Sequence, residues 1–259
     1  MNERFMREQF GLEGKRAVVT GGGRGIGRSI AEALAATGAE VLIHYHSSRE
    51  AAEQVVAHIT EAGGSAWSVG ADLTDSAQVK AMFEKVAEHW DSLDILVNNA
   101  GDLVERSMVA DITDELVQKV VAVNLCTTVY VNREAIGLLR RGRDACMIHL
   151  GSIAAPTGGG PGSSLYAAMK GALHTYSRNL AKELAPDIRV NTIAPGVILT
   201  DFQRRHSSDE LLEQLKSATP LKRHGLPEEH GAAAVFLCAP ASSFITGTVL
   251  HINGGLWMG

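Results

Sequence analysis

Short apolar runs rich in β-branched residues alternate with longer segments of helical periodicity along most of this chain. The runs are continuously apolar instead of alternating, which is typical of strands in a parallel sheet covered on both faces. Predicted strands lie at 17–20, 41–43, 65–69, 95–97, 147–150, 190–193 and 249–252. Predicted helices lie between them at 25–37, 49–61, 76–90, 113–139, 163–184 and 228–237. This alternation predicts an α/β fold, a doubly wound parallel sheet with helices on both faces and right-handed crossovers.

Composition limits the class of protein further. A chain of 259 residues with 45% hydrophobic residues fits a single domain spanning 1–259. The net charge of −5 and the lack of a dense Lys/Arg stripe argue against nucleic acid as a partner. No apolar run is long enough to span a bilayer, so no membrane association is expected. The three cysteines, Cys126, Cys146 and Cys238, are sparse and form no CxxC pair. This pattern favours free thiols and a cytoplasmic location.

A glycine-rich segment from Thr20 to Gly27 joins the first predicted strand to the first predicted helix. Glycines let the backbone turn tightly and approach a pyrophosphate, while the helix N-terminus supplies free N–H groups and partial positive charge. No Gly-Lys-Ser/Thr follows, which excludes a P-loop. We therefore predict a dinucleotide-binding loop of the Rossmann fold, with contacts from Gly21, Gly23, Arg24, Gly25, Ile26 and Gly27.

Four polar residues follow in an order that suits proton transfer. Tyr166 and Lys170 lie four positions apart in a predicted helix, which places both on one face. Ser152 follows the fifth strand, and Asn124 lies in the helical segment before that strand. Taken singly, Ser152 could be a strand-end hydrogen bond, Asn124 a helix kink, and Tyr-x-x-x-Lys a chance match. Their common order favours one catalytic group.

The glycine spacing Gly21-x-x-x-Gly25-x-Gly27, with this order of polar residues, resembles the short-chain dehydrogenase/reductase family from about Gly14 to Gly255. The resemblance implies an oxidoreductase that moves a hydride between a nicotinamide cofactor and a carbonyl or secondary alcohol. It also implies that Tyr166 is the acid/base, and that Lys170 lowers the pKa of Tyr166 and binds the nicotinamide ribose. Ser152 would donate a hydrogen bond to the substrate oxygen, and Asn124 would hold a water molecule. Ser152 precedes Tyr166 by 14 positions, one more than is usual in the family. We expect the extra residue within 157–164, in a glycine-rich loop.

The same resemblance implies further cofactor contacts. An Asp-Leu pair after the third strand would address adenine, and an Asn-Asn-Ala-Gly motif after the fourth would steady the sheet and line the ribose: Asp72, Leu73, Asn99, Ala100 and Gly101. The segment after the sixth strand would hold the nicotinamide carboxamide, through Pro195, Gly196, Ile198 and Thr200. The simpler interpretation of Asp72 is a turn cap.

The end of the second predicted strand bears on the form of the cofactor. An acidic residue there would hold the ribose hydroxyls of NAD, yet 44–49 contains no acid. Hydroxyls and cations bind a 2′-phosphate instead, so NADP(H) is predicted, with NAD(H) as the alternative. The predicted 2′-phosphate contacts are Arg24, Tyr45, His46 and Ser47. The pair His44 and His46 lacks a third ligand, so no metal is expected.

The substrate is less constrained. The family's 3-oxoacyl-carrier-protein reductases are the most similar in pattern, together with glucose- and polyol-type dehydrogenases. A basic cluster of Arg140, Arg141 and Arg143 would suit an acidic carrier, although helix-end arginines commonly complement the dipole. The polar segment 199–220 is predicted to be an irregular, mobile substrate lid. The partners expected are a small carbonyl or alcohol substrate and further copies of the chain, as a tetramer or dimer.

Two other classes of protein share this type of fold. A nucleotide-binding sensor without catalysis would be expected to lose Ser152, Tyr166 or Lys170, and all are present. An epimerase or dehydratase on this fold typically carries a longer C-terminal substrate domain than the present sequence shows.

Overall fold

The computed structural model describes residues 3–259 and centres on one parallel sheet. Within these residues seven strands pair in the order β3-β2-β1-β4-β5-β6-β7. Their bounds are β1 Arg16–Val19, β2 Glu40–Tyr45, β3 Ser65–Gly70, β4 Ile95–Asn98, β5 Ala145–Leu150, β6 Ile188–Pro195 and β7 Val249–Ile252. Every pairing is parallel. The doubly wound α/β prediction is therefore confirmed.

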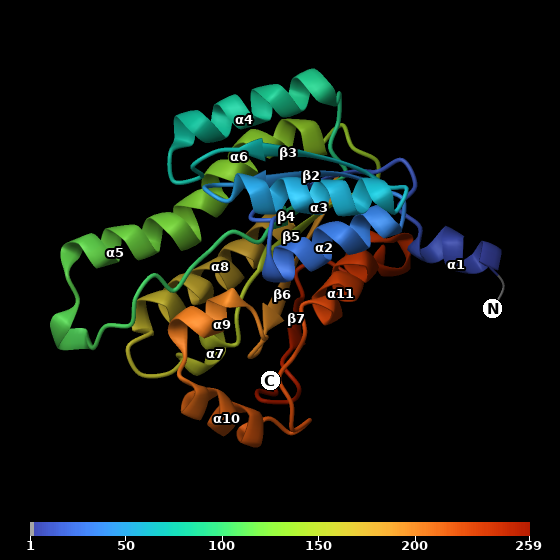
Figure 1. The fold of residues 1–259 in the computed structure, drawn as a ribbon. Helices are drawn as coiled ribbons and strands as arrows, with labels where there is room; N and C mark the ends of the chain where they lie inside the picture. Colours follow the sequence, from blue (N-terminus) through green and yellow to red (C-terminus); the bar gives the residue numbers. More distant parts are fainter. Residues whose placement is uncertain (1–2) are drawn as a thin grey trace.

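Helices cover both faces of the sheet, as Figure 1 shows. Three pack on one face: α2 Gly25–Ala36, α3 Arg49–Glu61 and α11 Glu228–Cys238. The other face carries α4 Ser76–His89, α6 Thr127–Leu139 and α8 Ser164–Glu183. Because side chains alternate along a strand, neighbours such as Val18 and Val19 enter opposite layers.

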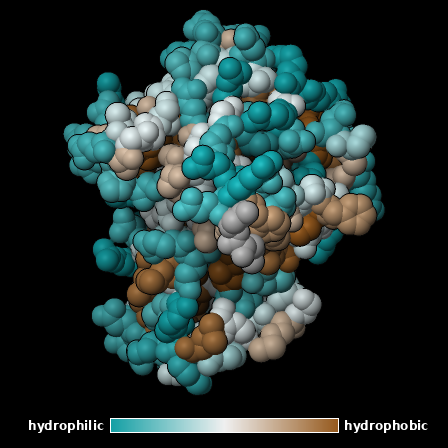
Figure 2. All heavy atoms as spheres, turned by 90° about the vertical axis from the view of Figure 1, so that its right-hand side faces the viewer, coloured by the Kyte–Doolittle hydropathy of each residue, from teal (hydrophilic) through white to brown (hydrophobic). Residues whose placement is uncertain are grey.

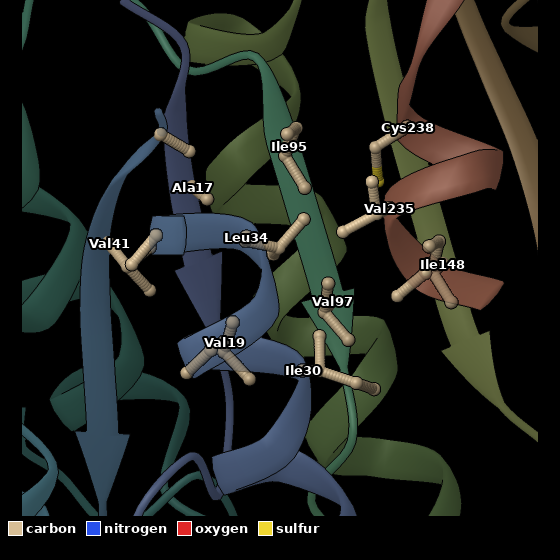
Figure 3. Close-up of a cluster of buried hydrophobic side chains, with 14 of the residues drawn as sticks. Ala17, Val19, Ile30, Leu34, Val41, Ile95, Val97, Ile148, Val235 and Cys238 are labelled. Carbon is tan, nitrogen blue, oxygen red and sulfur yellow. The ribbon is translucent and has the colours of Figure 1, made fainter. Parts of the chain in front are cut away.

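The first layer forms a close-packed core between α2, α11 and the strands. Figure 3 shows Ile30 and Leu34 of α2 directed toward Val19 and Val97 of the sheet, with Val235 of α11 beside them. All of these side chains are buried. Such interiors have the density of organic crystals, so the loss of a few methyl groups is not easily absorbed.

The predicted helix 113–139 contains an interruption that the sequence pattern did not show. It comprises α5 Asp114–Val121, a π-helical turn η2 at Ala122–Cys126, and α6. Asn124 lies in this turn, and its Nδ2 donates to the Val120 carbonyl at 3.0 Å. A side chain that takes part in the helical ladder is a recognised cause of such a bulge.

The segment 199–220 is not irregular, which corrects the prediction. It contains α9 Asp201–His206 and α10 Asp209–Ala218. Ser208 caps α10, its side chain accepting from the Leu211 amide, and acidic residues fill the first turn. Two further helices were not predicted, α1 Glu3–Phe10 and α7 Ala154–Thr157. No helix between residues 3 and 259 is long and apolar enough to cross a bilayer.

Replacing Leu34 by Ala should lower the free energy of unfolding by about 3 kcal/mol, because the cavity lies between α2 and the sheet. Urea unfolding followed by circular dichroism measures the change. Val109 is 83% exposed, so Val109→Ala is the matched control and should shift the free energy by less than about 0.5 kcal/mol. Equal losses in the two variants would contradict the packing described above.

Candidate active site

The predicted site residues gather at the carboxyl edge of the sheet, where parallel strands end side by side. The glycine segment leaves β1 and enters α2 there. Gly21 and Gly25 have φ of +62° and +54°, a region that favours glycine. A Cβ on Gly27 would lie 2.4 Å from Asn99 Nδ2, so only glycine permits this approach. The free amides at the start of α2 suit a bound phosphate.

Thr20 and Asn99 bind this loop to β4. The Thr20 hydroxyl accepts from the amides of Asn99 at 2.9 Å and Ala100 at 3.0 Å. The Asn99 side chain donates to the carbonyls of Thr20 and Gly21 at 2.9 and 3.1 Å. The Asn-Asn-Ala-Gly motif therefore lies against the glycine loop.

The sequence assigns no role to His44, and the structure places its ring against the glycine loop. The Gly21 amide donates to its Nδ1 at 3.1 Å, which leaves Nε2 protonated and donating to the Ala71 carbonyl at 3.0 Å. Burial lowers the pKa of His44 to about 4, so the neutral ring persists at physiological pH. A histidine inside an otherwise apolar strand was the signal available in the sequence.

Polar side chains surround the end of β2. Arg24 donates a hydrogen bond to the Ser48 hydroxyl, which brings the glycine loop and this strand end together. His46 and Ser47 are exposed beside them, whereas the Tyr45 ring lies over Gly70 of β3. Arg49, by contrast, pairs with Glu53 on α3 at 2.7 Å and is a surface charge.

Asp72 does cap a turn, as its simpler interpretation expected. Its Oδ1 accepts from the Thr74 amide at 2.9 Å and the Thr74 hydroxyl at 2.7 Å. The hydroxyl bond is the main cause of a lowered Asp72 pKa. Its Oδ2 lies 3.9 Å from His46 Nε2, and the adjoining Leu73 is buried.

The segment after β6 reaches the glycine loop. Gly196 passes so close to Asn253 that a Cβ would lie 2.7 Å from its Cα. Thr200 lies over the loop, its Cγ2 3.3 Å from where a Cβ of Gly25 would stand. Ile198 between them is buried. The predicted phosphate and nicotinamide segments are thus adjacent, as one dinucleotide requires.

Ser152, Tyr166 and Lys170 come together at the end of β5. Ser152 lies near enough to Tyr166 to lower the pKa of the tyrosine in part. Lys170 Nζ lies 5.6 Å from the Tyr166 ring centre and donates to the Leu150 carbonyl at 2.7 Å. The 14-residue separation is accommodated by α7 and a loop in which Gly158, Gly159 and Gly162 have positive φ.

Electrostatics at this cluster differ from expectation. Burial raises the pKa of Tyr166 to about 12, and the neighbouring Ser152 only partly opposes the shift. Burial also lowers the pKa of Lys170 to about 8. The prediction that the ammonium lowers the tyrosine pKa is therefore wrong for the net shift, because burial is the largest cause and Lys170 is not among the groups that shift it.

Asn124 joins the cluster through its other atom. Its Nδ2 donates to the Asp102 carbonyl at 2.7 Å, which directs the side chain toward Gly101. Its Oδ1 is buried without a partner among the described residues. A Cβ on Gly101 would stand 3.0 Å from this oxygen and 3.3 Å from Lys170 Nζ. An unpaired acceptor beside an ammonium fits a polar group bound between them.

The arginine cluster lies at the opposite edge of the sheet, before β5 begins. Arg141 donates to the carbonyls of Asp91 and Gly137, both at 2.8 Å, and Arg143 donates to the Glu13 carbonyl at 2.9 Å. These bonds close the end of α6. The cluster is therefore a poor candidate for steering a carrier protein to Ser152.

The comparisons agree with this geometry. The family described as enoyl-(acyl carrier protein) reductase matches residues 21–257. A 3-oxoacyl-[acyl-carrier-protein] reductase of Staphylococcus aureus is 36% identical, over 94% of this chain and 98% of the relative. The Pseudomonas aeruginosa RhlG/NADP active-site complex has a TM-score of 0.90 at 34% identity, covering 96% and 98%. A Burkholderia cenocepacia short-chain dehydrogenase in complex with NADP gives 0.88 at 37%, covering 95% and 98%.

A parallel sheet with this glycine loop and these relatives defines a nicotinamide-dependent oxidoreductase. The chain belongs to the short-chain dehydrogenase/reductase family.

Lys170 provides a test of burial that needs no substrate. Its folded-state pKa of about 8 lies below the ordinary value of 10.5, so the unfolded chain binds more protons between these pH values. The stability that the native protein loses to this lysine is therefore regained as pH rises from 8 to 10.5. Lys170→Met removes the effect. Its unfolding free energy relative to the parent, from urea titrations, should fall across this window. A difference independent of pH would contradict the burial of the ammonium.

Proposed function

We propose that this enzyme reduces a carbonyl with NADPH, with Tyr166 as the proton donor. The observation that carries the proposal is the convergence of Ser152, Tyr166 and the Lys170 ammonium at the end of β5, with Lys170 Nζ 5.6 Å from the tyrosine ring centre. A pKa of about 12 keeps the tyrosine protonated at neutral pH, which is the state that reduction requires.

Each residue of the group then has one task. Ser152 donates a hydrogen bond to the substrate oxygen and stabilises the charge that develops there. Tyr166 gives its proton to that oxygen, and the phenolate left behind is stabilised by Lys170. Lys170 then passes a proton back to the phenolate, and Asn124 Oδ1 holds a water through which Lys170 regains that proton. A bound nicotinamide supplies the hydride.

The residues at the end of β2 support NADP(H) over NAD(H). No carboxylate ends this strand, and Arg24, Tyr45, His46, Ser47 and Ser48 offer a cation, a phenol, an imidazole and hydroxyls there. Two solved relatives are named as complexes with NADP. We place the adenine near Asp72 and Leu73, its ribose beside Asn99, Ala100 and Gly101, and the carboxamide beside Pro195, Gly196, Ile198 and Thr200. The pyrophosphate lies along Gly21, Gly23, Gly25, Ile26 and Gly27.

For the substrate we propose a 3-oxoacyl thioester or a comparable apolar ketone, with a sugar or polyol as the alternative. A relative is named as a 3-oxoacyl-[acyl-carrier-protein] reductase, and another, from Emericella nidulans, as a versicolorin reductase. The segment 199–220 is the proposed lid, because the ring of Phe202 in α9 lies 6.0 Å from that of Tyr166.

We also propose that copies of the chain associate through the β7 side, as a tetramer or dimer. β7 is an edge strand whose four residues are all only half-buried. Figure 2, which looks at the right-hand side of the view in Figure 1, shows brown apolar surface among the teal. Exposed apolar side chains include Leu221, Leu226 and Phe244. The cytoplasmic location stays a prediction, supported by the free cysteines.

Tyr166→Phe should lower kcat for NADPH-dependent ketone reduction by at least about a hundredfold, because general acid catalysis contributes that much. Absorbance at 340 nm with a panel of acetoacetyl thioester, small ketones and polyols measures it. NADPH affinity should stay unchanged, since the change removes one hydroxyl. Tyr176→Phe, on the same helix, is the control and should keep full activity. Parental turnover in Tyr166→Phe would refute the proposed role.

Tyr45→Asp should reduce the ratio of kcat/KM with NADPH to that with NADH by about tenfold or more, a difference of about 1.4 kcal/mol. The new carboxylate repels the 2′-phosphate. Tyr45→Asn removes the same ring without adding charge and separates repulsion from lost packing. An equal change of the ratio in both variants would count against a 2′-phosphate at this strand end.

A further inference from the structure

Asp102 directly follows the Asn-Asn-Ala-Gly motif and pairs with two residues more than a hundred positions away. Its Oδ2 accepts from Arg205 at 2.9 Å, and its Oδ1 lies 2.8 Å from His206 Nε2. Both partners belong to the end of α9. One carboxylate therefore connects the loop after β4 to the lid helix.

The same loop makes a second set of bonds. Arg106 donates to the His206 carbonyl at 2.8 Å and to the Pro161 carbonyl at 3.0 Å. The Ser107 amide donates to the Gly162 carbonyl at 3.0 Å. Three segments are thus tied together around the site: the loop after β4, the glycine-rich loop before α8, and α9.

Burial indicates which of these contacts matters most. The side chain of His206 is only 9% exposed and that of Asp102 27% exposed. The other ion pair of α9, Arg204 with Asp201, is 3.5 Å long and largely exposed. Exposed pairs contribute little, whereas charge-assisted bonds away from water are stronger.

The bonded helix carries an aromatic side chain to the catalytic tyrosine. The Phe202 ring lies 4.8 Å from His206 and 6.0 Å from Tyr166. His206, held by Asp102, therefore packs against Phe202, which in turn lies near Tyr166. If α9 moved away from the site, Phe202 would no longer pack beside Tyr166.

We propose that Asp102 is a positioning residue for the lid, which holds α9 closed through Arg205 and His206 so that Phe202 packs beside the substrate carbonyl. The inference rests on the proposed function for its kinetic consequences, while lid closure can be measured without turnover.

Asp102 has a second effect, on the pKa of Tyr166, that a residue which only holds α9 in place would not have. Its negative charge is one of the causes that raise the pKa of Tyr166, after burial. The charged and titratable groups around it are Arg205 and His206 on α9, Tyr166 and Lys170 on α8, and Arg106 in its own loop. Removing the carboxylate should lower the tyrosine pKa, and removing its Arg205 counter-charge should raise it.

Lid closure is tested by limited trypsin digestion of the full chain, since Arg204 and Arg205 are cleavage sites within α9. Asp102→Asn should accelerate cleavage there by about fivefold or more, a population shift reasonable for the loss of charge-assisted bonds. His206→Gln should act in the same direction. Glu213→Gln is the control, because Glu213 pairs only with Lys216 inside α10. NADPH affinity, from a fluorescence titration, should not change in Asp102→Asn.

Kinetics give the second test. Asp102→Asn should raise KM for the ketone several-fold, with a smaller effect on kcat. In alcohol oxidation, which uses the phenolate, its kcat should rise at lower pH than in the parent. Arg205→Gln should also make α9 more sensitive to trypsin, which then cleaves at Arg204. In contrast to Asp102→Asn, it should shift the rise of kcat for alcohol oxidation to higher pH.

Trypsin cleavage of Asp102→Asn at the parental rate overturns the proposal. So does a pH limb that moves the same way in Asp102→Asn and Arg205→Gln, which would leave only a structural tie. If no ketone or alcohol is turned over, the proposed function fails, and the digestion still decides whether Asp102 holds the lid.

Discussion

The hydrogen bonds of Thr20 and Asn99 fasten β1 to β4 at the point where the strand order reverses, and the site depends on that junction. Chain connections leave this point in opposite directions, so a crevice opens above it. The glycine loop lies on one side and the Ser152–Tyr166 pair reaches in from the other. His44 holds the loop from beneath, and Gly27 allows Asn99 to approach it. This junction brings the glycine loop and the proposed proton donor to the same edge of the sheet.

Much of the fold could be predicted because buried parallel strands are continuously apolar and the helices between them are amphipathic. The bounds of α3 were predicted to the residue, and those of α2, α4 and α8 to within one at either end. Helices α9 and α10 were missed because both are short and neither contains a fully buried residue. The π turn at Asn124 was missed for another reason: its side chain bonds depend on Asp102, which periodicity does not register.

The candidate site followed a similar division. Residues within motifs came together because most motifs follow a neighbouring strand, and α8 carries Tyr166 and Lys170 to the same edge of the sheet. Contacts between distant segments were invisible, above all those of Asp102 with Arg205 and His206. The direction of the Tyr166 pKa shift was also misjudged. A sequence shows that a lysine stands one turn away, but not how completely the surrounding chain removes water from both groups.

The sheet separates the helices that support the glycine loop from the helix that carries Tyr166 and Lys170. α2 and α3 contribute to one core, whereas α8 packs in the other. The two cores are separate clusters of side chains, so substitutions in the two layers should combine nearly additively in their effects on stability. Descendants of such a chain could therefore change which nucleotide they accept without changing which substrate they turn over. Because the sheet lies between the two layers of helices, cofactor specificity and substrate specificity could change independently during evolution.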